Sequence, residues 1–195
     1  MSRQLRNWEL TGFLFTAAAG VLLHFVFGWS GENPAAGAFA AVNESTWEHM
    51  KLLAMPALLF TALQCCAMGY RYLNFLAARG ASVLAGTLLI PALFYTYTGI
   101  LGFNMMWADI AIFFLADFFL FWLDFSLLRR GALSSPVLQV AGAAVLLGLL
   151  FCFVWCTYHP AHWNLWRDPV SGKYGIPRRM ASHSLDPVGN RRYNE

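Results

Sequence analysis

The run from Pro136 to Tyr158, PVLQVAGAAVLLGLLFCFVWCTY, contains no acidic or basic side chain. A helix crosses the hydrocarbon core of a bilayer with about 20 consecutive, predominantly apolar residues, so this run predicts a transmembrane helix. Ser135 is a common N-cap residue, and Pro136 suits the first helical turn that follows it. This stretch alone therefore indicates an integral membrane protein.

Four further apolar runs of similar length precede this one. Of the 195 residues, 58% are hydrophobic and only 12% are charged, whereas a soluble domain carries roughly 25% charged residues. We therefore predict an all-α, polytopic transmembrane helix bundle over residues 1–158, followed by an extramembrane C-terminal tail over residues 159–195. The five predicted spans are roughly residues 11–29, 51–70, 81–102, 105–128 and 136–158.

Arginines in the short connections predict the orientation of the chain. They precede the first span, lie between the second and third spans, and follow the fourth span: Arg3, Arg6, Arg71, Arg79, Arg129 and Arg130. Because short loops rich in Lys and Arg stay in the cytoplasm, we expect the N-terminus inside and the C-terminus outside. The basic tail after Tyr158 opposes this assignment, although long segments translocate largely regardless of charge.

Polar side chains from all five spans gather at the predicted outer level of the bundle. They are His24, Asn43, Glu44, Trp47, Glu48, His49, Lys51, Tyr95, Tyr97, Asp109 and His159. An ionisable group at membrane depth costs about 2.5–3.5 kcal/mol on insertion scales, so such groups usually face a partner or a wet cavity. The sequence therefore predicts a polar pocket near the outer leaflet.

Two kinds of chemistry fit the residues of this predicted pocket. Imidazoles and carboxylates bind divalent ions such as Zn²⁺, so His24, His49, Glu48 and Asp109 are the predicted metal ligands. Carboxylates also act as general acids and bases, and Glu48, Asp109 and Glu44 are the predicted catalytic residues.

The same residues also have a purely structural interpretation. Glu44 and Glu48 at a helix start are favoured by the helix dipole, and Trp47 suits an interfacial aromatic belt. His159 follows the last span and fits a solvated tail residue. The zinc-binding sequence His-Glu-x-x-His does not occur. A metal centre and a metal-free polar pocket therefore both stay open at this point.

A second polar feature lies in the fourth span. Asp109, Asp117 and Asp124 fall within about an 80° arc of one helix face and extend over roughly 22 Å of depth. A line of carboxylates can relay protons or pass cations, which makes Asp117 and Asp124 a predicted proton path. The alternative is that each aspartate is paired structurally, with Arg129 or Arg130 for Asp124 and Gln64 as a further partner.

Four segments resemble a family of uncharacterised prokaryotic multi-pass membrane proteins, known as a domain of unknown function. They are Leu23-His24-Phe25, residues 42–51 with the string Asn-Glu-Ser-Thr-Trp-Glu-His, residues 93–102, and residues 109–113. The resemblance extends from the first span through the fourth and excludes Asp117 and Asp124. It implies a small polytopic protein of a prokaryotic cytoplasmic membrane and no established activity.

Three classes of function are compatible with this sequence. The first is a membrane-embedded hydrolase or transferase that acts on a lipid-linked small molecule at the outer leaflet, and we place it first because the polar groups converge at one level. The second is a proton- or cation-coupled transporter that uses the span-four aspartates, and the third is a non-catalytic assembly or accessory subunit. The lipid bilayer is the expected partner. Nucleic acid is not an expected partner, because the positive-inside loops explain the net charge of +3. No feature of the sequence specifies an oligomeric state.

Overall fold

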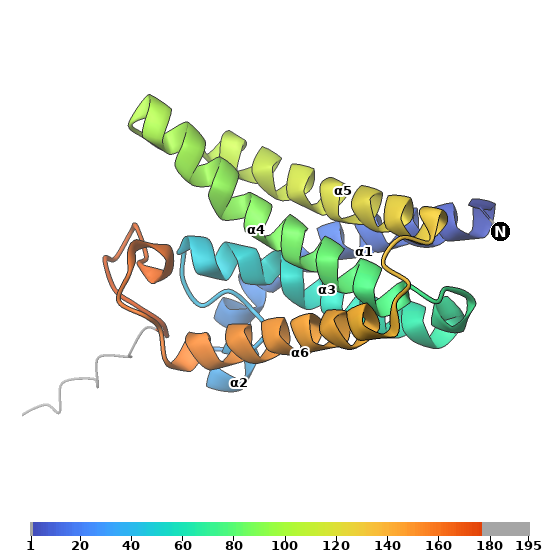
Figure 1. Cartoon of the computed structure of the whole chain (residues 1–195). Coiled ribbons are helices and arrows are strands. Elements are labelled where there is room, and N and C mark those ends of the chain that lie inside the picture. Colours follow the sequence, from blue (N-terminus) through green and yellow to red (C-terminus); the bar gives the residue numbers. More distant parts are fainter. Residues whose placement is uncertain (1, 177–195) are drawn as a thin grey trace, which may run out of the picture.

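The computed structural model describes residues 2–176, so residues 177–195 of the predicted tail lie outside the described residues. Five long helices form the bundle in Figure 1: α1 (Ser2–Trp29), α3 (Thr46–Met68), α4 (Phe75–Leu101), α5 (Met106–Arg130) and α6 (Pro136–Tyr158). Three short helical turns connect or follow them: α2 (Pro34–Gly37), η1 (Gly69–Arg71) and η2 (Asn164–Trp166). The described residues contain no β-strand, only an isolated bridge between Arg167 and Tyr174.

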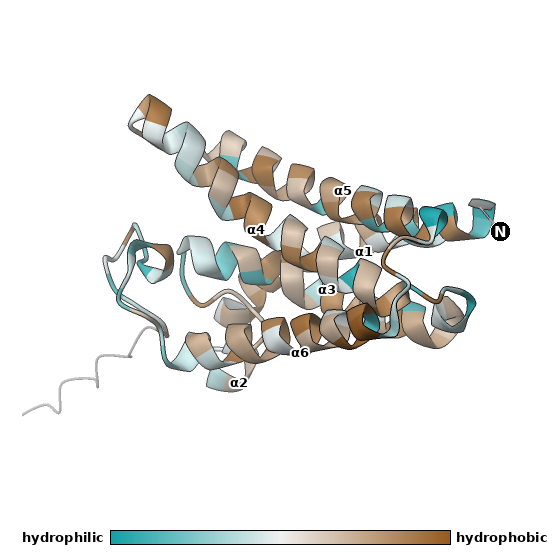
Figure 2. Ribbon diagram, viewed as in Figure 1, coloured by the Kyte–Doolittle hydropathy of each residue, from teal (hydrophilic) through white to brown (hydrophobic). Residues whose placement is uncertain are grey.

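All five long helices are long and apolar enough to cross a membrane, which confirms the predicted all-α bundle. Large apolar side chains lie on their outward faces, where Val137 is 75% exposed and Leu147 is 68% exposed. Figure 2 shows the apolar colour along the helices and the polar colour mainly at their ends. Exposed apolar area of this extent marks a surface that contacts another apolar phase, and a lipid bilayer supplies one.

Two helices begin earlier than the apolar runs predicted. The third span was expected from about Ala81, with Arg79 in the loop before it, but α4 begins at Phe75 and contains Arg79. The first span was expected from about Thr11, but α1 begins at Ser2 and contains Glu9. Both charged side chains are buried, Arg79 completely. These helices extend past the apolar runs because Arg79 and Glu9 neutralise each other's charge and can therefore be buried inside the bundle.

Arg79, Glu9, Gln64 and Asp124 form a buried cluster that we call the Arg79 network. Arg79 Nη2 donates to Glu9 Oε2 at 3.1 Å and also to Gln64 Oε1, and Arg79 Nε lies 3.3 Å from Asp124 Oδ2. Gln64 Nε2 donates to Glu9 Oε1 at 2.7 Å. These four side chains come from α4, α1, α3 and α5, so one guanidinium joins four of the five long helices.

The partners of the Arg79 network differ from those expected for Asp124. Arg129 or Arg130 was expected to reach Asp124, but both lie exposed at the end of α5, and Arg79 pairs with it instead. Gln64, expected as a partner of an aspartate, bonds Glu9 and Arg79. The Arg79 guanidinium also lies over the rings of Phe60, at 5.8 Å, and Phe121, at 5.1 Å. Aromatic faces attract cations, so these rings add to its stabilisation.

Close backbone contact holds α6 against α4. A Cβ atom placed on Gly80 would lie 2.7 Å from Gly142 Cα, and one placed on Gly142 would collide with the carbonyl of Leu76. Helices in lipid gain little from burying apolar surface against each other, so association depends on such close packing of small residues. Gly80 and Gly142 therefore allow the approach that positions α6.

The two ends of the bundle differ in how tightly the helices pack. We call the end at Ser2 the N-terminal end, and the end where α1 stops at Trp29 the distal end. The Arg79 network lies toward the N-terminal end, because its members come from the early turns of α1 and α4 and from the late turns of α3 and α5. At the distal end, α4 and α5 run together beyond α3 and lean away from the other helices (Figure 1). Residues 159–176, which we call the C-terminal strap, fold back over the distal end (Figure 1).

The central role of the Arg79 network gives a stability prediction. Replacing Arg79 by Ala leaves the Glu9 and Asp124 carboxylates buried without a cation, and breaking a buried ion pair costs about 3–5 kcal/mol. The free energy of unfolding, measured by denaturant titration in detergent micelles, should fall by this amount. Arg71→Ala is the matched control, because Arg71 is exposed and its hydrogen bonds within the described residues go to Gln4 and Tyr70. Equal effects of the two substitutions would contradict this role.

Candidate metal centre

The chain that leads into α3 determines where three candidate ligands point. Ser45 is the N-cap of α3 and accepts a hydrogen bond from Glu48 N at 3.4 Å, and Asn43 Oδ1 accepts one from Ser45 N at 2.9 Å. Glu44 therefore precedes the helix. A continuous helix would place Glu44 on one face with Glu48 and Lys51, but that spacing does not apply to a residue before the helix. In the structure Glu44 turns instead toward His49 in the first turns of α3.

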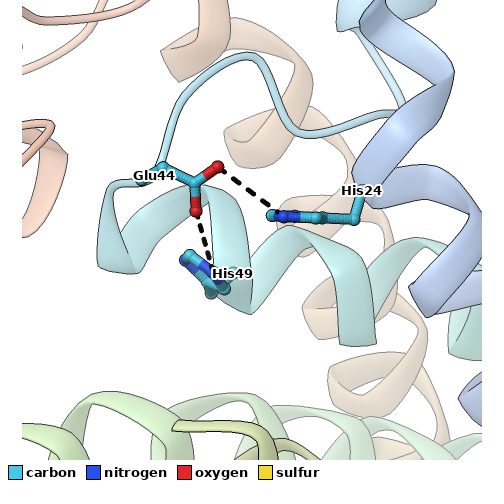
Figure 3. Close-up of side chains that lie close together, drawn as sticks. All are labelled: His24, Glu44 and His49. Atoms are coloured by element: carbon cyan, nitrogen blue, oxygen red, sulfur yellow. Dashed lines mark ion pairs between the residues drawn. The ribbon is translucent and has the colours of Figure 1, made fainter. Parts of the chain in front are cut away.

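His24, Glu44 and His49 converge on one point. His24 Nε2 on α1 lies 3.6 Å from Glu44 Oε1, and His49 Nε2 lies 3.6 Å from Glu44 Oε2 (Figure 3). One ligand atom from each of the three residues lies within 4.8 Å of the other two. Atoms that bind one tetrahedral zinc ion at 2.0–2.1 Å are about 3.4 Å apart. The three side chains thus approach the spacing of a two-histidine, one-carboxylate metal site.

The hydrogen bond of His49 fixes which ring nitrogen is available. His49 Nδ1 lies 3.0 Å from the carbonyl oxygen of Ser45. A carbonyl oxygen only accepts, so Nδ1 carries the proton, and Nε2 of the neutral ring presents a lone pair to the Glu44 carboxylate. Two electron-rich atoms that face each other are stabilised by a cation between them, either a proton or a metal ion. Metal-bound histidines usually make this same bond from their second nitrogen to a carbonyl.

The three residues line a cavity of about 990 Å³ at the distal end. Its walls come from α1, α3, α4, α5 and the strap, and they are mostly apolar, with Leu52, Ile90, Phe94, Ile112, Phe113 and Phe114 among them. The side chains of His24, Glu44 and His49 are 29%, 48% and 36% exposed, so the ligand atoms are accessible from this space. Cavities of this size and character hold small molecules.

Asp109 and two tyrosines also belong to this end of the cavity. Asp109 and Tyr95 line it. The Tyr97 hydroxyl donates to Asp109 Oδ1 and accepts a hydrogen bond from Met105 N at 3.2 Å. Tyr97 thereby fixes the carboxylate of Asp109, which lies in the cavity wall at the start of α5. The arrangement provides a positioned carboxylate in the same space as the two imidazoles.

The structure separates Glu48, a predicted ligand and catalytic acid, from the cavity. Glu48 is 2% exposed and Lys51 is completely buried, and Lys51 Nζ lies 2.5 Å from Glu48 Oε2. Val42 N donates to the same carboxylate at 3.2 Å, and Lys51 donates to Gly37 O and Thr157 Oγ1, each at 2.8 Å. Consecutive helical residues point about 100° apart, so Glu48 faces the protein interior when His49 faces the cavity.

The other predicted pocket residues lie around the cavity without lining it. Trp47 packs between Phe153 and Trp166, with ring centroids 4.6 and 4.7 Å away. Asn43 Nδ2 donates to Gly175 O at 2.9 Å and so attaches the strap. His159 stacks on Trp155 at the end of α6, with ring centroids 4.2 Å apart.

The two predicted proton-path residues have different environments. Asp124 belongs to the Arg79 network. Asp117 is completely buried in α5, and neither of its carboxylate oxygens has a hydrogen-bond partner among the described residues. The structure therefore provides a structural partner for Asp124 and none for Asp117 within the described part of the chain.

Sequence reasoning missed Arg167, which lines the cavity from the strap. It was counted only among the charges of the basic extramembrane tail. The turn signal directly after it, from Asp168 to Gly172, was the available indication that this part of the tail is ordered. No signal in the sequence indicated that the ordered segment returns to α3.

Asp168 holds this turn of the strap together. Burial alone would raise the pKa of Asp168, but its carboxylate accepts hydrogen bonds from the Ser171 hydroxyl and from the N–H groups of Val170, at 3.0 Å, and Ser171, at 3.3 Å. These bonds outweigh burial and lower the pKa below its ordinary value, and the backbone of Glu44 contributes in the same direction. Asp168 thus links the strap to the segment before α3 that contains Glu44.

The lowered pKa of Asp168 predicts that attachment of the strap depends on pH. A lowered folded-state pKa stabilises the strap above the unfolded value of about 3.9, and this stabilisation is lost as pH falls through the folded value. Hydrogen exchange of residues 159–176, corrected for its intrinsic pH dependence, should therefore show protection that declines below about pH 4. Asp168→Asn should show low protection at every pH. A pH step that persists in this variant would assign the effect to another group.

Comparison with known proteins identifies a family without a described activity. The model of a family of unknown function, DUF6512, matches residues 1–176, so the chain belongs to this family. No curated protein and no solved structure matches the chain.

Proposed function

We propose that this DUF6512 member is an integral membrane protein that binds a divalent metal ion such as Zn²⁺ through His24, Glu44 and His49. With this ion it would hydrolyse or transfer a group on a lipid-linked substrate. The observation that carries the proposal is the position of His49 Nε2, which faces the Glu44 carboxylate at 3.6 Å while Nδ1 faces Ser45 O at 3.0 Å. A shared cation relieves the repulsion between these two acceptors.

The number of ligands favours chemistry over a purely structural ion. Structural zinc sites are closed by four protein ligands, whereas catalytic sites have three and leave a position for water or substrate. Here three side chains converge and the cavity borders them. A bound divalent ion would lower the pKa of a water molecule and polarise a substrate oxygen.

Asp109 is the proposed general acid or base for this reaction. It lies in the wall of the same cavity, and Tyr97 holds its carboxylate by a hydrogen bond. A carboxylate held in one position can accept a proton from a metal-activated water and return it to a leaving group. The apolar walls suit the hydrocarbon part of a lipid-linked substrate.

The arginines support an orientation with the metal centre on the outer side of a prokaryotic cytoplasmic membrane. Because Arg79 is buried in α4, it no longer counts as a loop charge. The remaining arginines of this group lie in the terminal turns of helices at the N-terminal end of the bundle: Arg3 and Arg6 at the start of α1, Arg71 in η1, and Arg129 and Arg130 at the end of α5. That end is the proposed cytoplasmic side, which places the distal end outside.

Metal content tests the proposed function. Protein purified in mild detergent without chelators should contain about one divalent metal ion per chain, since one ion satisfies a single three-ligand site. His24→Ala, Glu44→Gln and His49→Ala should each lose it, because each removes one ligand. His159→Ala is the matched control and should retain the metal, because His159 lies at the end of α6 and stacks on Trp155. Retention of full metal content by the three ligand variants would refute the site.

A second candidate function, proton movement, is favoured by Asp117. This carboxyl group is buried without a hydrogen-bond partner among the described residues, on the same helix as Asp109 and Asp124. An unpaired ionisable group inside a membrane is costly, and such groups often serve ion or proton movement.

Asp117→Asn tests this second candidate. The asparagine amide has almost the same shape as the Asp117 carboxyl group but cannot take up and release a proton as a carboxyl group does. The variant should therefore fold normally and lose any proton flux that the wild type supports. Proton flux is measured with a pH-sensitive dye in protein-loaded vesicles, with protein-free vesicles as the baseline. Equal flux in the variant and the wild type, or wild-type flux at the baseline, would exclude Asp117 as a proton carrier.

A further inference from the structure

We propose that Arg167 and the metal centre together bind the phosphate headgroup of a lipid whose hydrocarbon part occupies the apolar cavity. The position of the headgroup at the metal rests on the proposed function, whereas the contribution of Arg167 rests on observations of its own. The substrate is thus a phosphate-bearing lipid, and Arg167 is the residue that selects it.

Arg167 is the only lysine or arginine among the described residues that line the cavity. Its guanidinium has no carboxylate partner in the described part of the chain, in contrast to Arg79 and Lys51, which are both paired. The carboxylates of the cavity and of the strap have other partners: Glu44 pairs with His24 and His49, Asp109 accepts from Tyr97, and Asp168 is engaged within its own turn. A cation at a cavity wall without an acidic partner is available to an anionic ligand.

The strap holds Arg167 in place from both sides. On one side, Trp166 stacks on Trp47 of α3, with ring centroids 4.7 Å apart. On the other side, the Asp168 turn follows, and Asp168 N donates to Lys173 O at 2.9 Å. Gly172, with φ of +69°, lies beside the guanidinium, where an added Cβ atom would be 3.6 Å from Arg167 Nη2. The backbone around Arg167 is therefore held in an ordered strap, and the exposed Arg167 side chain borders the cavity.

The balance of charge makes the cavity selective for anions only when the metal is present. A divalent ion bound by one carboxylate and two neutral imidazoles keeps one positive charge, Arg167 adds another, and Asp109 removes one. The result is a net positive charge with the metal and a net negative charge without it. A guanidinium presents paired N–H donors that match phosphate oxygens, and such charge-assisted bonds are strong.

The surroundings favour a lipid phosphate over free phosphate. Phe94, Phe113 and Phe114 line the cavity together with aliphatic side chains, in addition to its polar lining residues. Free phosphate would use only the polar groups, while a lipid phosphate would also bury its chain against the apolar walls. Burial of apolar area contributes about 25 cal/mol per Å², so the chain should strengthen binding substantially.

The test measures binding of a fluorescent phosphatidic acid to the purified, metal-loaded full chain in mild detergent. Unlabelled phosphatidic acid, diacylglycerol with the same chains, and inorganic phosphate are the competitors. Arg167→Gln should weaken binding about tenfold or more, because it removes charge-assisted hydrogen bonds. Arg167→Lys should restore part of the affinity. Arg130→Gln, an exposed arginine at the other end of the bundle, is the matched control and should bind like the wild type.

Competition and metal content separate the outcomes. Phosphatidic acid should compete far better than diacylglycerol or inorganic phosphate, and Arg167→Gln should keep its metal. Wild-type affinity in Arg167→Gln, or equal competition by diacylglycerol, would overturn the headgroup site. Equal competition by inorganic phosphate would overturn its assignment to a lipid. Binding that needs Arg167 but no metal would refute the metal-based function and leave the role of Arg167 intact.

Discussion

One buried guanidinium determines how the helices of this bundle meet. Arg79 contacts carboxylates from α1 and α5 and an amide from α3, and it lies over two aromatic rings. A charge in a membrane interior must be neutralised where it lies, so these helices can shift only if the network breaks. The network joins them toward the N-terminal end. At the distal end, where no comparable contact joins α5 to α3 among the described residues, α4 and α5 lean away and the cavity forms.

A second buried ion pair positions the residues of the proposed metal centre without belonging to it. Glu48 and Lys51 bind backbone groups of the connection before α3 and the Thr157 hydroxyl of α6. This fixes the rotation of α3, and with it the direction of His49 one residue after Glu48. Glu44 is held by the bonds of Asn43 and Ser45 on either side of it. Glu48, which the sequence predicted as a ligand and catalytic residue, thus orients the candidate ligands without being one of them.

Hydropathy was sufficient to predict the number of long helices, because each apolar run reaches the length of a bilayer span. It failed at the starts of α1 and α4, since Glu9 and Arg79 interrupt the apolar pattern and only their mutual pairing makes them suitable for the interior. Helical spacing failed for Glu44, which lies outside the helix. The convergence of His24, His49 and Asp109 at one level followed from span ends alone. The position of Arg167 did not, because it depends on contacts between the strap and α3 that are distant in sequence.

X-ray absorption at the zinc edge of the zinc-loaded protein shows whether a metal ion binds between His24, Glu44 and His49. We expect a shell of nitrogen and oxygen ligands at about 2.0–2.1 Å with the multiple scattering of imidazole rings. A shell dominated by sulfur at about 2.3 Å would contradict it, because the ion would then lie on cysteines. Failure of the folded protein to retain any zinc would contradict it equally.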